Sequence, residues 1–189
     1  MTKLDIDLAS KPGLITNTNV MGRTFDNEVF NDLENNTASG DYSHAEGSNT
    51  TASGNYSHAE GSNTTASSIG AHAEGQGSVA SGSSSHAEGT YTTASGINSH
   101  AEGDHTVAKG DRSHAEGYCT LTENVGAEGI GSHAEGRDTY AKGNYSHAEG
   151  YSQGGANVGA IGQGSHVEGF NTYASANYAH AEGGGTTAS

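Results

Sequence analysis

The stretch that decides the fold is Ser43-His44-Ala45-Glu46-Gly47-Ser48-Asn49-Thr50-Thr51-Ala52-Ser53-Gly54-Asn55-Tyr56, because its two halves resemble each other. Laid over one another, the halves align Ala45 with Ala52 and Gly47 with Gly54. The pentapeptide Ser-His-Ala-Glu-Gly, or a close variant of it, returns to the end of the 189-residue chain. Repetition at a short fixed period is typical of solenoids, in which each repeat packs on its neighbours.

The histidine and the glutamate of the motif recur together, two residues apart, throughout the repeats. The first six motif histidines are 14 residues apart, and the later spacings are 19, 14, 19 and 14. Two units are therefore longer than the others, within residues 117–132 and 150–165. The motif histidines are His44, His58, His72, His86, His100, His114, His133, His147, His166 and His180. The motif glutamates are Glu46, Glu60, Glu74, Glu88, Glu102, Glu116, Glu135, Glu149, Glu168 and Glu182.

Strand geometry assigns the side chains of this unit to two faces, since successive side chains of a strand point to opposite sides. We expect His44 and Glu46 on one face with Ala45 behind them, and Thr51 on the face opposite Ala52. If the two strands of a unit fold back on each other, the alanines meet inside. Glycine supplies the positive φ of tight turns, so a Gly-containing turn is expected after each strand. The sequence thus predicts an all-β parallel β-roll, a solenoid of about ten 14-residue coils stacked about 4.8 Å apart.

Composition and charge exclude several classes of function. Hydrophobic residues make up only 31% of the chain, a share that disordered proteins also have, but alanine and glycine at fixed offsets argue against disorder. The net charge of −15, without a basic patch, argues against nucleic acid as a partner. Cys119 is the single cysteine, so we expect a packed or solvent-facing thiol and no intrachain disulfide. Neither a transmembrane run nor a secretory signal is present, and we expect no membrane insertion by this segment.

The first 35 residues differ from the repeats. Alternating apolar residues over 4–8 predict a short strand, and apolar residues four apart over 25–33 predict a short helix. We interpret residues 1–35 as an N-terminal cap or attachment segment and residues 36–189 as the repeat region. Because the sequence stops halfway through a coil at Ser189, we expect that it is a fragment truncated at its C-terminus.

A roll filled with alanine buries little apolar surface. At about 25 cal/mol per Å², this burial does not offset the backbone ordering of the repeat region, so we expect a further face to be buried by association.

The Ser-x-Ala-x-Gly pattern on this period resembles the head repeats of trimeric autotransporter adhesins of the YadA type, where the pentapeptide is typically Ser-Val-Ala-Ile-Gly. The resemblance covers about residues 36–189. It implies a left-handed parallel β-roll and a homotrimer around one axis. Ser-His-Ala-Glu-Gly runs are also similar to repeats in fibre and appendage proteins of phages and prophages of Gram-positive bacteria, where they often precede a C-terminal self-cleaving chaperone domain.

Two motif residues depart from the adhesin pattern. His44 and Glu46 stand where that repeat has Val and Ile, whose side chains help form the apolar interface between chains. The resemblance therefore implies a polar trimer interior, in which the ten motif histidines and ten motif glutamates named above form interface pairs that neutralise each other.

Two other interpretations of this face stay open at lower weight. The ten motif histidines are candidate axial ligands for zinc or nickel, with only a few layers occupied, because cations in adjacent coils repel each other. Catalysis is disfavoured, since an active site is one place and this pair occurs ten times without a nucleophile at fixed spacing. We accordingly expect neither a cofactor nor enzymatic activity.

The opposite face and the turns carry their own alternatives. Thr51, Thr65 and Thr93 suggest a regular hydroxyl ladder, which we interpret as a solvated surface and, alternatively, as an ice-binding array. The tyrosines fall near turns, where they either cover coil edges or bind glycans. No Gly-Gly-x-Gly-x-Asp repeat is present, which argues against a calcium roll.

These observations favour a structural and adhesive role. The preferred hypothesis is the trimeric rod or head of a phage or prophage tail fibre or appendage, which presents a binding surface for a glycan or protein receptor on the host. The alternative is a bacterial cell-surface adhesin of the autotransporter-head type, and a further alternative is an ice- or metal-binding solenoid. The expected location is the virion fibre or the cell surface.

Overall fold

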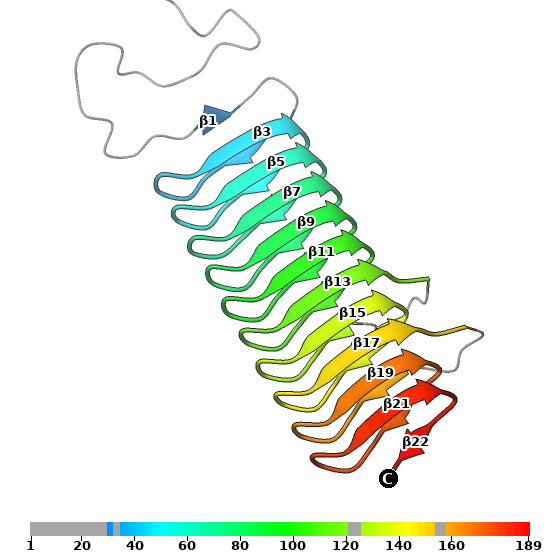
Figure 1. Ribbon diagram of the computed structural model, residues 1–189. Coiled ribbons are helices and arrows are strands. Elements are labelled where there is room, and N and C mark those ends of the chain that lie inside the picture. The colour runs from blue at the N-terminus through cyan, green and yellow to red at the C-terminus, as the bar shows by residue number, and fades with distance from the viewer. Residues whose placement is uncertain (1–29, 32–34, 121–125, 154–157) are drawn as a thin grey trace, which may run out of the picture.

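Two parallel β-sheets run side by side along a rod (Figure 1). The computed structural model describes residues 30–31, 35–120, 126–153 and 158–189. From residue 44 onward, each coil gives a five-residue strand to one sheet and a strand of two or three residues to the other. The predicted all-β parallel solenoid, with about ten turns of about 14 residues, is confirmed.

The first sheet, here the long-strand sheet, contains the histidine and glutamate of every motif. Its strands are β1 (Phe30–Asn31), β3 (His44–Ser48), β5 (His58–Ser62), β7 (His72–Gln76), β9 (His86–Thr90), β11 (His100–Asp104), β13 (His114–Tyr118), β15 (His133–Arg137), β17 (His147–Tyr151), β19 (His166–Phe170) and β21 (His180–Gly184).

The second sheet, here the short-strand sheet, contains the second alanine of each unit. Its strands are β2 (Thr37–Ala38), β4 (Thr51–Ala52), β6 (Thr65–Ala66), β8 (Val79–Ala80), β10 (Thr93–Ala94), β12 (Val107–Ala108), β14 (Gly126–Ala127), β16 (Thr139–Ala141), β18 (Val158–Ala160), β20 (Tyr173–Ala174) and β22 (Thr187–Ala188).

Every strand pairs in parallel with the equivalent strand of the next coil, and the register places identical motif positions on top of one another. His100 pairs with His86 on one side and His114 on the other. The longer units keep this register, because Ala127 still pairs with Ala108. The additional residues therefore lie in the connection between the two sheets, which has two residues between β11 and β12 and seven between β13 and β14.

Alanine fills the space between the two sheets, as predicted. Ala87 and Ala94 are completely buried, and the same is true of most of their equivalents. The motif serine also points inward: the Ser99 hydroxyl donates a hydrogen bond of 2.8 Å to the carbonyl of Gly96. The same bond recurs at Ser43, Ser57, Ser85, Ser132, Ser146 and Ser165. The serine thus satisfies a turn carbonyl inside a core that water does not reach.

Glycine supplies the positive φ in some of the turns, as expected, for example Gly70 at φ 64°. In other turns an asparagine or a tyrosine takes the left-handed conformation, for example Asn49 at φ 57° and Tyr56 at φ 60°. The motif glycines instead permit close approach of the coils. Gly89 has φ +111°, and a Cβ atom there would lie 2.1 Å from the carbonyl oxygen of Gly103 in the next coil. No other residue type fits this position without moving the backbone.

The two longer units contain a local exchange of small and large side chains. Tyr140 in β16 pairs with Gly126 on one side and with Gly159 on the other. A Cβ atom on Gly159 would lie 2.4 Å from the Tyr140 ring, which is 7% exposed. The Val-Gly-Ala sequences of these units therefore make room for a buried aromatic ring.

The N-terminal segment is described only in part. Phe30–Asn31 pair with His44–Ala45 in β3, so the helix predicted over 25–33 is wrong for these two residues. Pairing with the edge of β3 satisfies backbone groups that a helix would leave exposed at that edge. Residues 1–29, with the predicted strand at 4–8, lie outside the described part of the chain. No helix in the described residues is long and apolar enough to cross a membrane.

Candidate functional site

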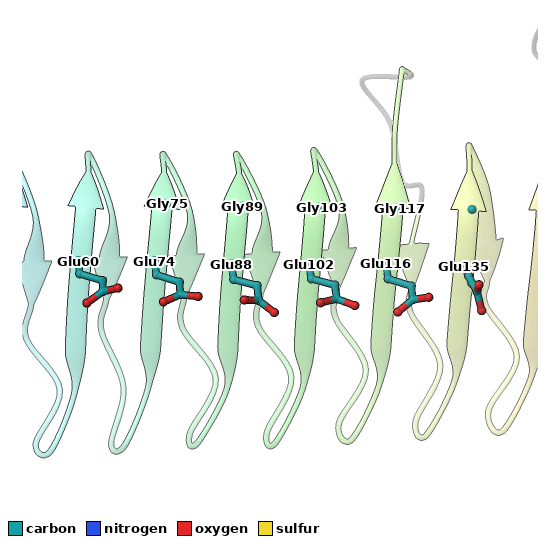
Figure 2. A pocket seen from close by; sticks show the side chains of 11 residues that line it. Glu60, Glu74, Gly75, Glu88, Gly89, Glu102, Gly103, Glu116, Gly117 and Glu135 are labelled. Atoms are coloured by element: carbon teal, nitrogen blue, oxygen red, sulfur yellow. The ribbon is translucent and has the colours of Figure 1, made fainter.

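The outer face of the long-strand sheet carries all twenty motif histidines and glutamates, and we call this set the His–Glu ladder. Each histidine begins a long strand and its glutamate follows two residues later, so the two side chains share the outer face. Figure 2 shows the glutamates projecting in a row from successive strands. In a single chain the ladder is half-exposed: the His86 side chain is 35% accessible and that of Glu88 is 32% accessible.

The imidazole rings of the ladder form a continuous stack. Between His58 and His180, adjacent ring centroids are 4.6 to 4.9 Å apart and the rings are parallel within 13°. The spacing is one strand separation, because register places each ring on the equivalent ring of the next coil. At the N-terminal end, the ring of His44 is tilted by 49° against that of His58.

The first six motif glutamates each lie within 4.0 Å of one or two imidazoles. His44 Nε2 is 3.2 Å from Glu46 Oε2 in the same coil, whereas His100 Nε2 is 3.2 Å from Glu88 Oε1 in the preceding coil. In the coils from His44 to Glu116, histidine–glutamate pairs thus come together both within a coil and between coils.

In a single chain, burial as well as the neighbouring glutamates sets the charge of the ladder histidines. Burial, reinforced by the neighbouring imidazole, lowers the pKa of His86 and His114 below the ordinary 6.5, and nearby glutamates offset this only in part. The same causes lower the pKa of His58, His133, His147 and His166. These imidazoles are neutral at neutral pH, so a single chain presents them beside uncompensated carboxylates.

Two adjacent carboxylates respond to this excess of negative charge. Glu116 forms a hydrogen bond with Glu102, and this bond, with burial and the charge of Glu135, raises the pKa of Glu116 to about 7. The same bond lowers the pKa of Glu102. Below about pH 7 the pair therefore holds one proton, because like charges one strand spacing apart destabilise each other.

A groove runs along the rod beside the glutamates. Its volume is about 700 Å³, and it is lined by Glu60, Glu74, Glu88, Glu102, Glu116 and Glu135 with the glycines Gly75, Gly89, Gly103, Gly117 and Gly136 (Figure 2). The glycine row forms part of its wall because these positions carry no side chain. The groove is therefore acidic and continuous across six coils.

Several imidazole nitrogens of the ladder have no hydrogen-bond partner although water does not reach them. These include the Nε2 atoms of His72 and His86 and, further along the rod, those of His133 and His147. A shielded polar atom without a partner is uncommon in a folded protein and indicates a missing ligand, water or neighbouring chain. Sequence reasoning could not detect this feature, because it depends on ring orientation.

The opposite face of the rod does not carry the regular hydroxyl ladder suggested by the sequence. Thr51 and Thr65 are followed in register by Val79, then by Thr93 and Val107. Further along, glycines and tyrosines take the same position. An ice-binding array needs a flat, repeated hydroxyl surface, so this face does not favour that alternative.

A second exposed feature was not predicted, and we call it the aromatic–arginine strip. Tyr118, Arg137, Tyr151 and Phe170 occupy the last position of four successive long strands and stack in register. The Arg137 guanidinium carbon lies 5.9 Å from the ring centroid of Tyr118 and 5.1 Å from that of Tyr151. Tyr151 in turn stacks on Phe170 with centroids 5.5 Å apart. Register alone brings these residues together, so the signal in the sequence is their equal offset from the motif histidine.

Comparison with known protein families gives one match. The family model of the YadA head domain repeat matches residues 45–67, 73–99 and 87–113. These residues contain the coils whose alanines and glycines build the core and the close contacts described above. Comparison with curated proteins found no match.

Proposed function

Because this chain carries YadA head domain repeats, we propose that it is the trimeric rod or head of a phage or prophage tail fibre or appendage. YadA head repeats are typical of extracellular structural and adhesive proteins rather than enzymes. In this proposal, residues 36–189 form the rod and residues 1–35 form a cap or attachment segment. The alternative is a bacterial surface adhesin of the autotransporter-head type.

One observation supports the proposed trimer: the half-exposed His–Glu ladder extends in register along the whole described rod. A regular row of partly buried polar groups can pair with the same row on a second copy of the chain, because the two rows have the same spacing. We propose that all twenty ladder residues face the common axis of three chains. Carboxylates of one chain then meet imidazole N–H groups of the next, which a buried polar interface requires.

Solution mass tests the assembly. We expect light scattering to give about three times the 19.1 kDa of one chain. His100→Glu adds a further carboxylate to the ladder and should lower this mass on dilution, because the axis then has excess negative charge. The matched control is Thr93→Glu on the short-strand sheet, which should leave the mass unchanged. A monomeric parent chain would refute the trimer.

We place the receptor-binding surface at the aromatic–arginine strip. Tyr118 is 45% exposed and Phe170 is 42% exposed, and Arg137 lies between two tyrosine rings. Aromatic and arginine side chains dominate the binding energy of many recognition surfaces. The inserted connections of the longer units begin next to this strip, after Tyr118 and Tyr151. A glycan or protein receptor on the host surface fits this combination of rings and charge.

Adhesion assays test the surface and separate the two origins. For a phage fibre, the labelled trimer should bind cell walls of Gram-positive bacteria, whereas a bacterial adhesin should bind animal cell surfaces instead. Arg137→Ala combined with Tyr151→Ala should reduce binding at least tenfold while the solution mass stays unchanged. Tyr56→Ala, at the stacked Tyr42–Tyr56 pair near the N-terminal end, is the control. Equal loss in both variants would refute the assignment to the strip.

A further inference from the structure

The carboxylate of Glu74 lies between two imidazoles of successive coils without bonding to either. Its Oε2 atom is 3.8 Å from His72 Nε2, and its Oε1 atom is 4.0 Å from His86 Nε2. Both distances are too long for hydrogen bonds. The two rings are parallel within 1°, with centroids 4.6 Å apart, and ligand atoms of the three residues all lie within 4.8 Å of one another. Three ligand-type groups therefore surround a space that none of them fills.

The two nitrogens at this place supply an independent observation. Nε2 of His72 and Nε2 of His86 are shielded from water and have no hydrogen-bond partner. Leaving such an atom unpaired destabilises the folded state, because the nitrogen loses its hydration and gains nothing in return. A single cation beside the Nε2 edges of both rings would be a partner for the two nitrogens and for the carboxylate, once the rings turn so that their in-plane lone pairs point to it.

We propose that His72, Glu74 and His86 bind a divalent transition-metal ion, with zinc as the best match, and that the ion links two successive coils. Imidazole nitrogen and carboxylate oxygen are ordinary zinc ligands, whereas calcium and magnesium prefer oxygen alone. Ligand atoms around tetrahedral zinc are about 3.3 Å apart, as follows from bond lengths of about 2.0–2.1 Å. Side-chain rotations that shorten the present separations by up to about 1.5 Å, and that turn the two parallel rings toward each other, complete the site, with water in the fourth position.

The register repeats this arrangement but limits how many ions the ladder holds. Within the part of the chain that the structure describes, groups of the same composition are centred on Glu46, Glu88 and Glu116, and a group of two glutamates around His147 is a fifth candidate. The groups at Glu74 and Glu88 share His86, so four of the five can be filled at once. Neighbouring layers are one strand spacing apart, and two dications at that distance repel each other strongly. We therefore expect four ions per chain rather than one per coil.

This inference does not rest on the trimer, because each site draws its three side chains from one chain. A rod with filled sites should resist unfolding more than the metal-free rod, since an ion that binds only the folded chain stabilises it. The ion would link adjacent coils on the outer face of the long-strand sheet, which the buried alanines between the two sheets do not reach.

Zinc binding is measured on the full chain purified without a polyhistidine tag and stripped with a chelator. Isothermal titration with zinc sulfate, followed by dialysis and elemental analysis, should give four zinc ions per chain. His86→Gln should lower the count to three, because it removes both groups that share His86. His72→Gln should leave four, because His86 then binds with Glu88 and His100. The control is His105→Gln, outside the ladder, which should also leave four.

The opposite outcomes are equally clear. No bound zinc, about one ion per coil, or the same loss in His105→Gln as in His86→Gln would overturn the proposal. Circular dichroism checks that each variant folds. If His86→Gln does not fold, the visible absorption of the cobalt-loaded parent chain decides, because tetrahedral nitrogen and oxygen ligands give characteristic bands and an unbound ion does not. Light scattering of the same samples separates the two proposals: a monomer with four zinc ions refutes only the trimer, and a trimer without zinc refutes only the metal sites.

Discussion

Replacing Gly89 with alanine tests whether the glycine of the motif is required by backbone geometry. Gly89 has φ +111°, a conformation that costs a non-glycine residue about 1–3 kcal/mol. The new Cβ atom would also lie 2.1 Å from the Gly103 oxygen, so the two coils must separate by about 1 Å to reach ordinary contact. If two backbone hydrogen bonds between these coils are lost, about 2 kcal/mol is added. We expect Gly89→Ala to lower the free energy of unfolding by about 3–5 kcal/mol.

Other glycines of the same chain separate the two causes. Gly96→Ala has only the close contact, because its Cβ atom would lie 2.0 Å from a carbonyl oxygen while its φ is outside the positive range. Gly183→Ala has only the strain, with φ +104° and the nearest atom, on Thr186, 3.9 Å away. Gly184→Ala has neither, since nothing lies within 4 Å of its Cβ position.

The assay is urea unfolding followed by far-ultraviolet circular dichroism. We expect Gly184→Ala to match the parent chain, Gly96→Ala and Gly183→Ala to be intermediate, and Gly89→Ala to be the least stable. Equal unfolding midpoints for Gly89→Ala and Gly184→Ala would falsify the argument, because the close approach of the coils would then carry no energetic weight.

Three further predictions concern the ladder and the core. The pKa of six ladder histidines is lowered below 6.5, so their contribution to stability is complete above pH 6.5 and is lost as the pH falls through their folded-state pKa. The melting temperature should therefore be lower at about pH 5 than at about pH 7. An equal melting temperature at both pH values would contradict this. Glu116 has the opposite sign: its pKa is raised to about 7, so its contribution is lost as the pH rises through that value. The melting temperature of Glu116→Gln should therefore exceed that of the parent chain by more at about pH 8 than at about pH 5, when both chains are measured side by side. Ser99→Ala should cost about 1 kcal/mol in urea unfolding, because it removes a buried hydrogen bond. Its control is Ser113→Ala, whose buried hydroxyl has no partner and whose loss should cost nothing; equal effects of the two changes would contradict the role of the serine.

The architecture could be predicted from the sequence because a single pattern repeats. Ala45 and Ala52 occupy equal offsets in the two halves of the unit, and alternation along a strand places both inside. The shared face of His44 and Glu46 follows from the same rule. The alternation within one unit and the pairing between units place the same residues inside, so the structure of one coil could be extended to all ten.

The remainder could not be predicted, because it depends on orientation and on contacts between coils. Nothing in the spacing shows that Tyr56 takes a left-handed conformation, or that the motif serine points inward to bond a turn carbonyl. The exchange of Tyr140 against two glycines is visible only once the register of the longer units is known. The pKa directions in a single chain could not be predicted either, because they depend on burial and on stacked imidazoles, which lower the pKa of His86 and His114 more than the glutamates raise it.

The direction of the backbone hydrogen bonds sets how this rod responds to load. Bonds such as that from His100 N to Ser113 O, 2.9 Å long, join one coil to the next and so point along the rod. Each strand of the described residues contacts only strands of its own coil and of the adjacent coils. A pull along the rod is therefore carried by every interface in series, and each interface bears the whole force. The weakest interface sets the tensile limit, so adding coils lengthens the reach of such a rod without making it stronger.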